Sequence, residues 1–394
     1  MIKNKTRSAS DKASEKTISP EAAAAGRRAE NQEVAELPVK GFDYIEFYVG
    51  NAKQARYYYE HGLGFEVVGY KGLETGERHT TSYALRQNNI TIVLTSALSP
   101  DHEVAEHVRK HGDGVRSIGL RVDDARQCYE IAIERGAVSV YEPRVQTDDF
   151  GIFVSAAVKT YGDTIHTFVQ RKDYDGNIAP GYKLVNSWSG GVGLGTVDHV
   201  VGNVESGKMM EWVRFYENIF GFRVFQGFDA SDISTQYSAL TSRVMANRSG
   251  TIKMPINEPA PGEKKSQIQE YLDFYSAPGV QHIAMSTKNI IATVSQLKER
   301  GIEFLSVPRA YYESLKERVG LIDEDIEALS RLGILVDRES KGYLLQIFTK
   351  PVEDRPTLFF EIIQRKEGAS GFGKGNFLAL FESLEREQNQ RGNL

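Results

Sequence analysis

Two stretches of the chain, residues 42–70 and 197–227, share one order of apolar and polar positions. Each begins with a short run rich in β-branched or aromatic residues, which is typical of a strand. A polar linker and an amphipathic segment with aromatic anchors follow, and a Gly-Phe pair then begins a second strand-like run. The pattern therefore predicts the same strand–helix–strand unit at two places in the chain.

A second pattern also occurs twice, in residues 115–143 and 280–308. Each copy has a strand, a short turn, a helix that ends in Glu-Arg-Gly, and a strand that ends in proline. The glycine supplies the left-handed residue that commonly ends a helix. The chain thus contains two different units followed by the same two units again, which predicts a duplicated fold.

Further short apolar runs after each unit predict additional strands. They are residues 78–87, 90–96, 151–160 and 164–170 in the first half, and residues 234–242, 342–348 and 357–364 in the second. This order predicts repeated βαβββ modules in an α+β fold, and such modules resemble the vicinal-oxygen-chelate (glyoxalase-like) fold. The resemblance implies two open barrels of mixed sheet with helices outside. An insertion at 311–333 predicts two short charged helices.

Composition along the chain predicts where the halves divide. Residues 186–195 are rich in Gly and Ser, which favours a linker. The first 38 residues are polar, charged and poor in aromatic side chains, which predicts a disordered tail. We therefore predict a tail at 1–38 and two domains, at 39–185 and 192–394; the side chains considered below predict that the N-terminal domain is non-catalytic and the C-terminal domain catalytic.

Overall composition argues against several classes of protein. The 394 residues are 26% charged and 40% hydrophobic with a net charge of −5, so the chain lacks the basic surface that nucleic-acid binding requires. No apolar run approaches the roughly 18–20 residues of a membrane span, and the first residues lack the apolar region of a secretory signal. The single cysteine, Cys128, favours a reducing compartment. We therefore expect a cytoplasmic protein that binds neither nucleic acid nor membrane.

His199 stands in a run of valines in the first repeated strand of the second half. Strand alternation predicts that it faces away from Asp198, and by itself it would be interpreted as a core histidine. His282 occupies the matching position of the neighbouring module. Glu361 lies among apolar residues of the last strand, where a carboxylate is costly unless it is paired or binds a cation. Two imidazoles and a carboxylate are the facial triad of non-haem Fe(II), although Zn²⁺ accepts the same ligands.

The matching positions of the first half hold Tyr44, Ser117 and Thr167, none of which is a His or a Glu. One half is therefore predicted to bind a metal ion, and the other to be a duplicated scaffold without one.

The second half is similar to the 4-hydroxyphenylpyruvate dioxygenase family over long segments. They include VDHVVGNV (197–204), KMPINEPAPGEKKSQIQEYLDF (253–274), ILVDRESKGYLLQIFTKPVEDRPTLFFEIIQR (334–365) and GFGKGNFLALFESLEREQNQRGNL (371–394). The similarity extends from about residue 195 to residue 394 and, more loosely, over 40–177. It implies conversion of 4-hydroxyphenylpyruvate and O₂ to homogentisate and CO₂ in tyrosine breakdown, with one Fe(II) per chain, and a homodimer.

The resemblance also implies the residues of the site. His199, His282 and Glu361 match the iron ligands; Ser242, Asn257, Gln267, Gln281 and Gln346 match polar catalytic positions; Pro255, Phe348, Phe372, Asn376 and Phe377 match the substrate pocket. Neutral amides can hydrogen-bond a phenol or a carboxylate without adding charge near a metal, and aromatic walls keep a reactive site dry. Without the resemblance, Pro255 and Asn257 suit a turn, Gln267 a solvated loop, and the phenylalanines a core. Gln346 is expected to point inward because its neighbours are apolar.

The C-terminal segment has a physical interpretation of its own. Gly371, Gly373 and Gly375 are spaced as a flexible hinge, and residues 377–384 place an apolar stripe at helical spacing. The segment predicts a helix that is either a mobile lid over a dry site or a permanent cover.

Three other functions fit part of the pattern. 4-Hydroxymandelate synthase shares the substrate, iron and fold but hydroxylates the benzylic carbon; PIN at 255–257 and GFGKGNF at 371–377 favour the ring-hydroxylating family. An extradiol ring-cleaving dioxygenase also uses two His and a Glu, but the long C-terminal similarity argues against it. A non-catalytic drug-binding protein of the same fold would not need three metal ligands.

Overall fold

The computed structural model describes residues 34–185, 190–232, 235 and 237–393. Most of the predicted tail, and residues 186–189 of the predicted linker, therefore lie outside the described residues. The prediction is wrong at the end of the tail, because Leu37 is buried and its backbone N–H donates to the carbonyl of Phe220 at 2.9 Å. Burial of a leucine side chain stabilises the fold by about 1.5–3 kcal/mol, which outweighs the polar character of its neighbours.

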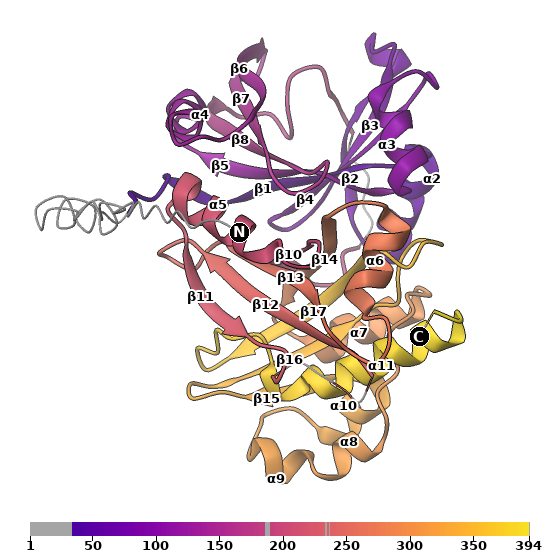
Figure 1. The fold of residues 1–394 in the computed structure, drawn as a ribbon. Coiled ribbons are helices and arrows are strands. Elements are labelled where there is room, and N and C mark those ends of the chain that lie inside the picture. Colours follow the sequence, from indigo (N-terminus) through magenta and orange to yellow (C-terminus); the bar gives the residue numbers. More distant parts are fainter. Residues whose placement is uncertain (1–33, 186–189, 233–234, 236, 394) are drawn as a thin grey trace, which may run out of the picture. The chain divides into compact units, whose positions relative to one another are not determined.

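The first half of the chain forms one mixed sheet, drawn from indigo to magenta in Figure 1. Its strands are β1 (Val39–Tyr48), β2 (Glu66–Lys71), β3 (Thr80–Gln87), β4 (Ile90–Ala97), β5 (Gly114–Val122), β6 (Ser139–Asp148), β7 (Gly151–Lys159), β8 (Ile165–Tyr174) and β9 (Lys183–Leu184). They lie in the order β6-β7-β8-β5-β1-β4-β3-β2-β9. The pairs β1–β4 and β5–β8 are parallel.

The second half forms a second mixed sheet with the same plan. Its strands are β10 (Leu194–Asn203), β11 (Arg223–Phe228), β12 (Ala239–Ala246), β13 (Lys253–Ala260), β14 (Gly279–Thr287), β15 (Leu335–Arg338), β16 (Tyr343–Phe348) and β17 (Phe359–Lys366). They lie in the order β11-β12-β13-β10-β14-β17-β16-β15, and β10–β13 and β14–β17 are the parallel pairs. Apart from β9, this is the order of the first sheet strand for strand, which confirms the predicted α+β fold of repeated modules.

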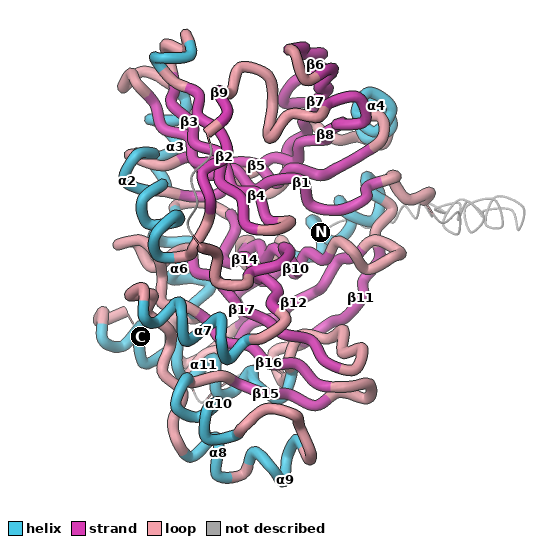
Figure 2. The backbone as a smooth tube through the Cα atoms, turned by 180° about the vertical axis from the view of Figure 1, so that it is seen from behind, coloured by secondary structure: helices cyan, strands magenta, loops and turns pink. Residues whose placement is uncertain are grey.

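The helices lie outside the two sheets (Figures 1 and 2). They are α2 (Ala52–Tyr57), α3 (Glu103–His111), α4 (Ala125–Glu134), α5 (Met209–Phe215), α6 (Gln267–Tyr275), α7 (Ile290–Glu299), α8 (Ala310–Glu313), α9 (Leu315–Val319), α10 (Ile326–Leu332) and α11 (Phe377–Gln390). The matched helices α4 and α7 are capped by the residues that precede them, Asp124 and Asn289, whose side chains accept a backbone N–H of the first turn. Among the described residues, no helix has both the length and the apolar character needed to cross a membrane.

The insertion at 311–333 differs from the prediction of two helices. The structure has three short helices there, α8, α9 and α10. Ser314 ends α8 after a single turn, and Gly320 ends α9 at a positive φ of 69°. Glycine adopts that conformation at little cost, so the chain turns there and begins the last helix separately.

Gln87 of the first sheet fixes the start of the second. Its side-chain oxygen accepts the backbone N–H groups of Val192, Gly193 and Leu194 at 2.8, 3.1 and 3.1 Å. Its side-chain nitrogen donates to the carbonyl of Leu63 at 3.0 Å. One core cluster contains buried residues of both sheets, so β10 starts from a fixed point on the first half.

Candidate metal centre and pocket

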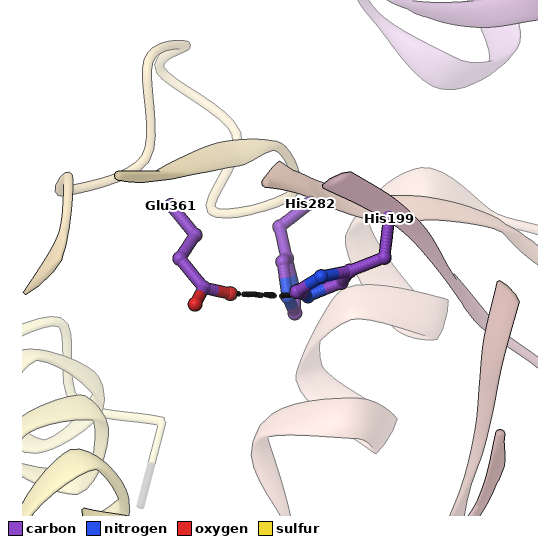
Figure 3. Close-up of side chains that lie close together, drawn as sticks. All are labelled: His199, His282 and Glu361. Carbon is purple, nitrogen blue, oxygen red and sulfur yellow. Dashed lines mark ion pairs between the residues drawn. The ribbon is translucent and has the colours of Figure 1, made fainter. Parts of the chain in front are cut away.

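His199, His282 and Glu361 come from three neighbouring strands, β10, β14 and β17 (Figure 3). His199 and Glu361 both stand opposite Ala284 of the middle strand. Residues opposite each other project from the same face of a sheet, and His282 shares that face because it is two residues from Ala284. The three side chains that the repeats singled out therefore project into one space.

Their polar atoms converge on one carboxylate oxygen. Oε2 of Glu361 lies 3.2 Å from Nε2 of His199 and 3.5 Å from Nε2 of His282. His199, His282 and Glu361 form a group that could hold a metal ion, because one ligand atom from each lies within 4.8 Å of the others. None of the three residues is more than 9% exposed.

Two β-bulges aim the histidines. Between Val197 and His199 the strand β10 has one residue more than its partner, and the extra residue is Asp198. Its carboxylate accepts a hydrogen bond from Nδ1 of His199 at 2.8 Å, so the predicted alternation of these two residues is wrong. A second shift of register leaves Gln281 as the extra residue before His282, and its amide oxygen accepts from Nδ1 of that histidine at 2.9 Å.

The charges of the group suit a cation. Burial opposes the charge on Glu361, but the two imidazoles outweigh burial and lower the pKa of its carboxyl to about 2. Burial lowers the pKa of His282, which keeps its imidazole neutral. Burial also opposes a charge on His199, yet the carboxylates of Glu361 and Asp198 raise its pKa. A metal ion at Nε2 of His199 competes with a proton there, because metal ligands have to be deprotonated.

The donor set fits a divalent transition metal. Two imidazole nitrogens and one carboxylate oxygen on one face of a sheet are the facial triad of ligands, which leaves coordination positions open toward the pocket. The Nδ1 atoms are occupied by Asp198 and Gln281, so the Nε2 atoms are the ones presented to a metal.

A pocket opens onto these three side chains, and it brings together every predicted site residue except Asn376. Those residues are His199, Ser242, Pro255, Asn257, Gln267, Gln281, His282, Gln346, Phe348, Glu361, Phe372 and Phe377. The lining is completed by Val201, Phe228, Leu240, Val244, Phe359, Leu380, Phe381 and Leu384. The pocket is thus walled by aromatic and aliphatic groups, with a few neutral polar side chains among them.

The lining residues that the sequence analysis did not name as site residues differ in how far the sequence could have predicted them. Leu380, Phe381 and Leu384 belong to the predicted apolar stripe of the C-terminal helix. Val201 and Phe359 lie two residues from His199 and Glu361, so strand alternation would have placed them on the same face. Nothing in the local sequence signals Phe228, which ends β11.

The polar side chains of the pocket come from regular elements. Asn257 stands opposite Ser242 in the β12–β13 pair, so the turn suggested for Pro255 and Asn257 is wrong. Pro255 is accommodated because the parallel ladder between β13 and β10 begins only at Ile256. Gln267 is the first residue of α6 rather than part of a solvated loop.

Gln346 points inward as predicted, and its amide is not fully satisfied. The residue is 1% exposed, yet its side-chain oxygen has no hydrogen-bond partner among the described residues. An unpaired buried amide oxygen lowers the free energy of unfolding by about 1–3 kcal/mol. Such an unpaired group is therefore uncommon, and here it is consistent with a position that binds a ligand.

Asn376 is the exception among the predicted pocket residues. Its side chain is fully buried, and its Oδ1 lies 2.7 Å from the hydroxyl of Tyr311. That hydroxyl also accepts the backbone N–H of Val336 at 2.8 Å. Asn376 therefore ties the start of α11 to β15 through its Oδ1, while its buried amide nitrogen has no hydrogen-bond partner among the described residues, so its role in the pocket stays a prediction.

The C-terminal helix α11 covers the pocket with its apolar stripe. The segment before it is anchored: Gly371 donates its N–H to Glu339 at 3.0 Å, and Gly375 donates its N–H to Asp337 at 3.0 Å. Gly373 has a φ of 72°, and a Cβ there would lie 2.4 Å from the side-chain oxygen of Gln346. This glycine is therefore needed both for its backbone conformation and for the close approach to Gln346.

In the first half, hydroxyl groups occupy the corresponding place. Oγ of Ser117 lies 2.8 Å from Oγ1 of Thr167. Gly119 takes the position of Ala284, and the ring of Tyr44 lies over it so closely that a Cβ would be 2.9 Å from the ring. Neither Tyr44, Ser117 nor Thr167 offers a carboxylate or an imidazole to a divalent metal.

Comparisons with known proteins agree with this geometry. Residues 35–180 match the family model "Hydroxyphenylpyruvate dioxygenase, HPPD, N-terminal", and residues 196–346 match the "Glyoxalase/Bleomycin resistance protein/Dioxygenase superfamily". The 4-hydroxyphenylpyruvate dioxygenase of Dictyostelium discoideum is 48% identical over 90% of this chain and 100% of its own. That of Danio rerio is 49% identical over 91% and 94%.

Solved structures add a more distant likeness. A triple mutant of 4-hydroxymandelate synthase from Streptomyces coelicolor superposes with a TM-score of 0.79 at 33% identity, over 89% of this chain and 99% of that one. A TIM barrel/4-hydroxyphenylpyruvate dioxygenase fusion protein shares the fold with a TM-score of 0.70 at 23% identity, over 93% of this chain and 57% of that one. The identity to the dioxygenases is the higher, so the synthase alternative is not favoured, and the chain belongs to the 4-hydroxyphenylpyruvate dioxygenase family.

Proposed function

We propose that the protein is an Fe(II)-dependent dioxygenase that converts 4-hydroxyphenylpyruvate and O₂ to homogentisate and CO₂ in tyrosine breakdown. The observation that carries the proposal is the buried group His199–His282–Glu361, which faces an aromatic pocket containing neutral amides. The proposed substrate rests on the relatives named 4-hydroxyphenylpyruvate dioxygenase, which are 48–49% identical over about nine-tenths of the chain.

One Fe(II) per chain, held by the two imidazoles and the carboxylate, supplies activation of O₂ and coordination of the 2-oxo acid. Glu361 stays ionised at neutral pH because its pKa is about 2, so it balances part of the charge of the cation. The bulge residues Asp198 and Gln281 hold the histidine rings through Nδ1 and keep Nε2 directed at the ion.

The rest of the pocket binds the organic substrate in this proposal. Ser242, Asn257, Gln267, Gln281 and Gln346 offer hydrogen bonds without net charge, and the unpaired oxygen of Gln346 awaits a donor such as a phenol hydroxyl. Phe348, Phe372 and Phe377 surround an aromatic ring, and α11 keeps water out while the chemistry proceeds.

One experiment tests the reaction directly. The purified protein is loaded with Fe(II) without oxygen and mixed with 4-hydroxyphenylpyruvate and O₂, and the product is identified by mass spectrometry. Homogentisate is the expected product. Release of 4-hydroxymandelate would instead assign the protein as the synthase, and absence of O₂ consumption would refute both.

The cellular context forms part of the same proposal. A cytoplasmic location is supported by Cys128, a buried free thiol that does not need an oxidising compartment. We propose a homodimer, which a mass measurement in solution would distinguish from a monomer of 44.0 kDa.

A further inference from the structure

Arg365 links the metal centre to the segment that leads into the covering helix. Its Nε and Nη2 donate to the two oxygens of Asp198, each at 2.8 Å, in a bidentate pair. Asp198 in turn accepts from Nδ1 of His199. The third nitrogen, Nη1, donates to the carbonyl of Gly371 at 2.6 Å. One guanidinium therefore fixes both the partner of a metal ligand and the backbone before α11.

The aromatic residue after Gly371 closes this arrangement. The ring of Phe372 lies 4.9 Å from the ring of His199, at an angle of 65° between their planes. The guanidinium carbon of Arg365 lies 5.8 Å from the centre of the same ring. His199 is thus held on one side by Asp198 and bordered on another by Phe372, and Arg365 contacts both of these neighbours.

The first half contains the same ion pair without a metal ligand. Arg171 of β8 donates to Asp43 through Nε and Nη2 at 2.8–3.0 Å, and its Nη1 donates to the carbonyl of Ile178. Asp43 precedes Tyr44 as Asp198 precedes His199. The burial is also similar, with side chains 5% and 19% exposed for Asp43 and Arg171, against 11% and 17% for the second pair.

The duplication separates two roles of the pair. An Asp–Arg pair that spans these strands is a property of the fold, because both halves have it. What the second half adds is the hydrogen bond from His199, since a tyrosine has no ring N–H to donate. The hydrogen bond from His199 to Asp198, which the first pair lacks, is therefore the feature that relates the second pair to metal binding.

We propose that Asp198 and Arg365 are positioning residues for metal binding: Arg365 holds Asp198, and Asp198 orients His199 toward the ion. The inference rests on the proposed function, since it needs a metal at this site. Replacing the hydrogen-bond partner of a metal-bound histidine typically lowers metal affinity or activity about 10–100-fold. Arg365 further couples this orientation to the segment at Gly371.

The test compares matched variants of the full-length protein. Asp198→Ala and Arg365→Lys are set against Asp43→Ala and Arg171→Lys, and Asp198→Asn restores an acceptor oxygen. Co²⁺ affinity is measured by titration of the metal-free proteins, with the visible absorption of bound Co²⁺ as a second readout. Thermal unfolding of the metal-free proteins and hydrogen exchange over residues 369–377 complete the set.

We expect Asp198→Ala and Arg365→Lys to weaken Co²⁺ binding about 10–100-fold and to alter its absorption spectrum. The variants of the first half, Asp43→Ala and Arg171→Lys, should keep the wild-type affinity for Co²⁺. Their loss of thermal stability should be comparable to that of the matching second-half variants. Asp198→Asn should recover most of the affinity, and Arg365→Lys alone of the two Arg variants should speed exchange at 369–377. If Asp198→Ala does not fold, the affinity of Arg365→Lys carries the comparison with Arg171→Lys.

Other outcomes overturn the proposal. Unchanged Co²⁺ affinity in both second-half variants would make the pair purely structural, like its copy. A loss in Asp198→Ala but none in Arg365→Lys would remove Arg365 from the role. Failure of the wild-type protein to bind Co²⁺ or Fe²⁺ would instead contradict the proposed function, and the two failures are therefore distinguishable.

Discussion

Part of the acid sensitivity should come from His166, a buried histidine that joins the halves of the chain. His166 lies in β8, is 0% exposed, and places its Nε2 at 2.8 Å from the hydroxyl of Tyr216 in the second half. The rings of Tyr216 and Phe220 lie 5.6 and 5.2 Å from its own. Burial in these surroundings lowers the pKa of His166 to about 3. The perturbation that isolates this effect is His166→Gln, which keeps a polar group without a titrating ring.

The sign and size of the effect follow from linkage. The pKa of an unfolded histidine is about 6.5. Because the pKa of His166 is lower in the folded state, the unfolded chain takes up the proton first as the pH falls. The contribution is present in full above pH ~6.5 and is lost progressively toward pH ~3. At pH 5 the wild-type protein should have lost about 2 kcal/mol of unfolding free energy through this residue.

Urea unfolding of the metal-free proteins at pH 8 and pH 5 measures the difference. The wild-type protein should lose about 2 kcal/mol more than His166→Gln between the two pH values. Replacement of the exposed His79 by Gln is the matched control and should leave the wild-type pH dependence in place. Equal losses in the wild-type protein and in His166→Gln would refute the argument, because the buried ring would then titrate as it does in the unfolded chain.

Three further predictions concern the site. Glu361→Gln should reduce metal affinity and turnover by more than about 100-fold, which exceeds the effect expected for a hydrogen-bond partner of a ligand such as Asp198. Metal analysis of the dialysed variant checks this, and its circular dichroism spectrum should stay unchanged. Gln346→Leu should raise the unfolding free energy by about 1 kcal/mol, since it removes an unpaired buried oxygen, yet should lower kcat/KM at least about 10-fold, so urea unfolding and steady-state kinetics should move in opposite directions. Gly373→Ala should cost about 1–3 kcal/mol and raise KM, because its φ is 72° and the new Cβ would displace Gln346; normal stability and KM would contradict the close approach.

The repeats made much of the fold predictable. Runs of β-branched residues and two amphipathic patterns, each present twice, fix the order of strands and helices within a module. Duplicated modules pair their strands in the same order. The positions of His199, His282 and Glu361 could therefore be matched with those of Tyr44, Ser117 and Thr167 before any contact was known. The ligands then fall on adjacent strands of one face, as the register shows.

The bulges could not be predicted. A bulge adds one residue to one strand, and its position depends on the pairing of two segments far apart in sequence. Asp198 therefore seemed to face away from His199, although the extra residue turns its carboxylate toward that ring. Gln281 owes its contact with His282 to the same kind of shift.

Other differences come from tertiary packing that overrides local preference. MPINEP has two prolines and an asparagine, which suit a turn, but residues 253–260 form a buried strand because β12 pairs along their whole length. Asn376 accepts a hydrogen bond from Tyr311, an interaction between the inserted helices and the C-terminal segment. No pattern within either segment contains that information.

Comparison of the halves shows which side chains distinguish the candidate metal centre. Both sheets have the same strand order, the same parallel pairs and the same Asp–Arg pair, and register shifts occur at corresponding points of β1–β5 and β10–β14. The scaffold of the metal centre is therefore present twice. What differs is the set of side chains at three positions, where hydroxyl groups in one half replace two imidazoles and a carboxylate in the other. Tyr44 also fills the space above Gly119, so the first half has exchanged a ligand position for packing. Installing ligands at Ser117 and Thr167 would not create a site unless that ring were removed as well, because its bulk occupies the position from which the third ligand would reach a metal.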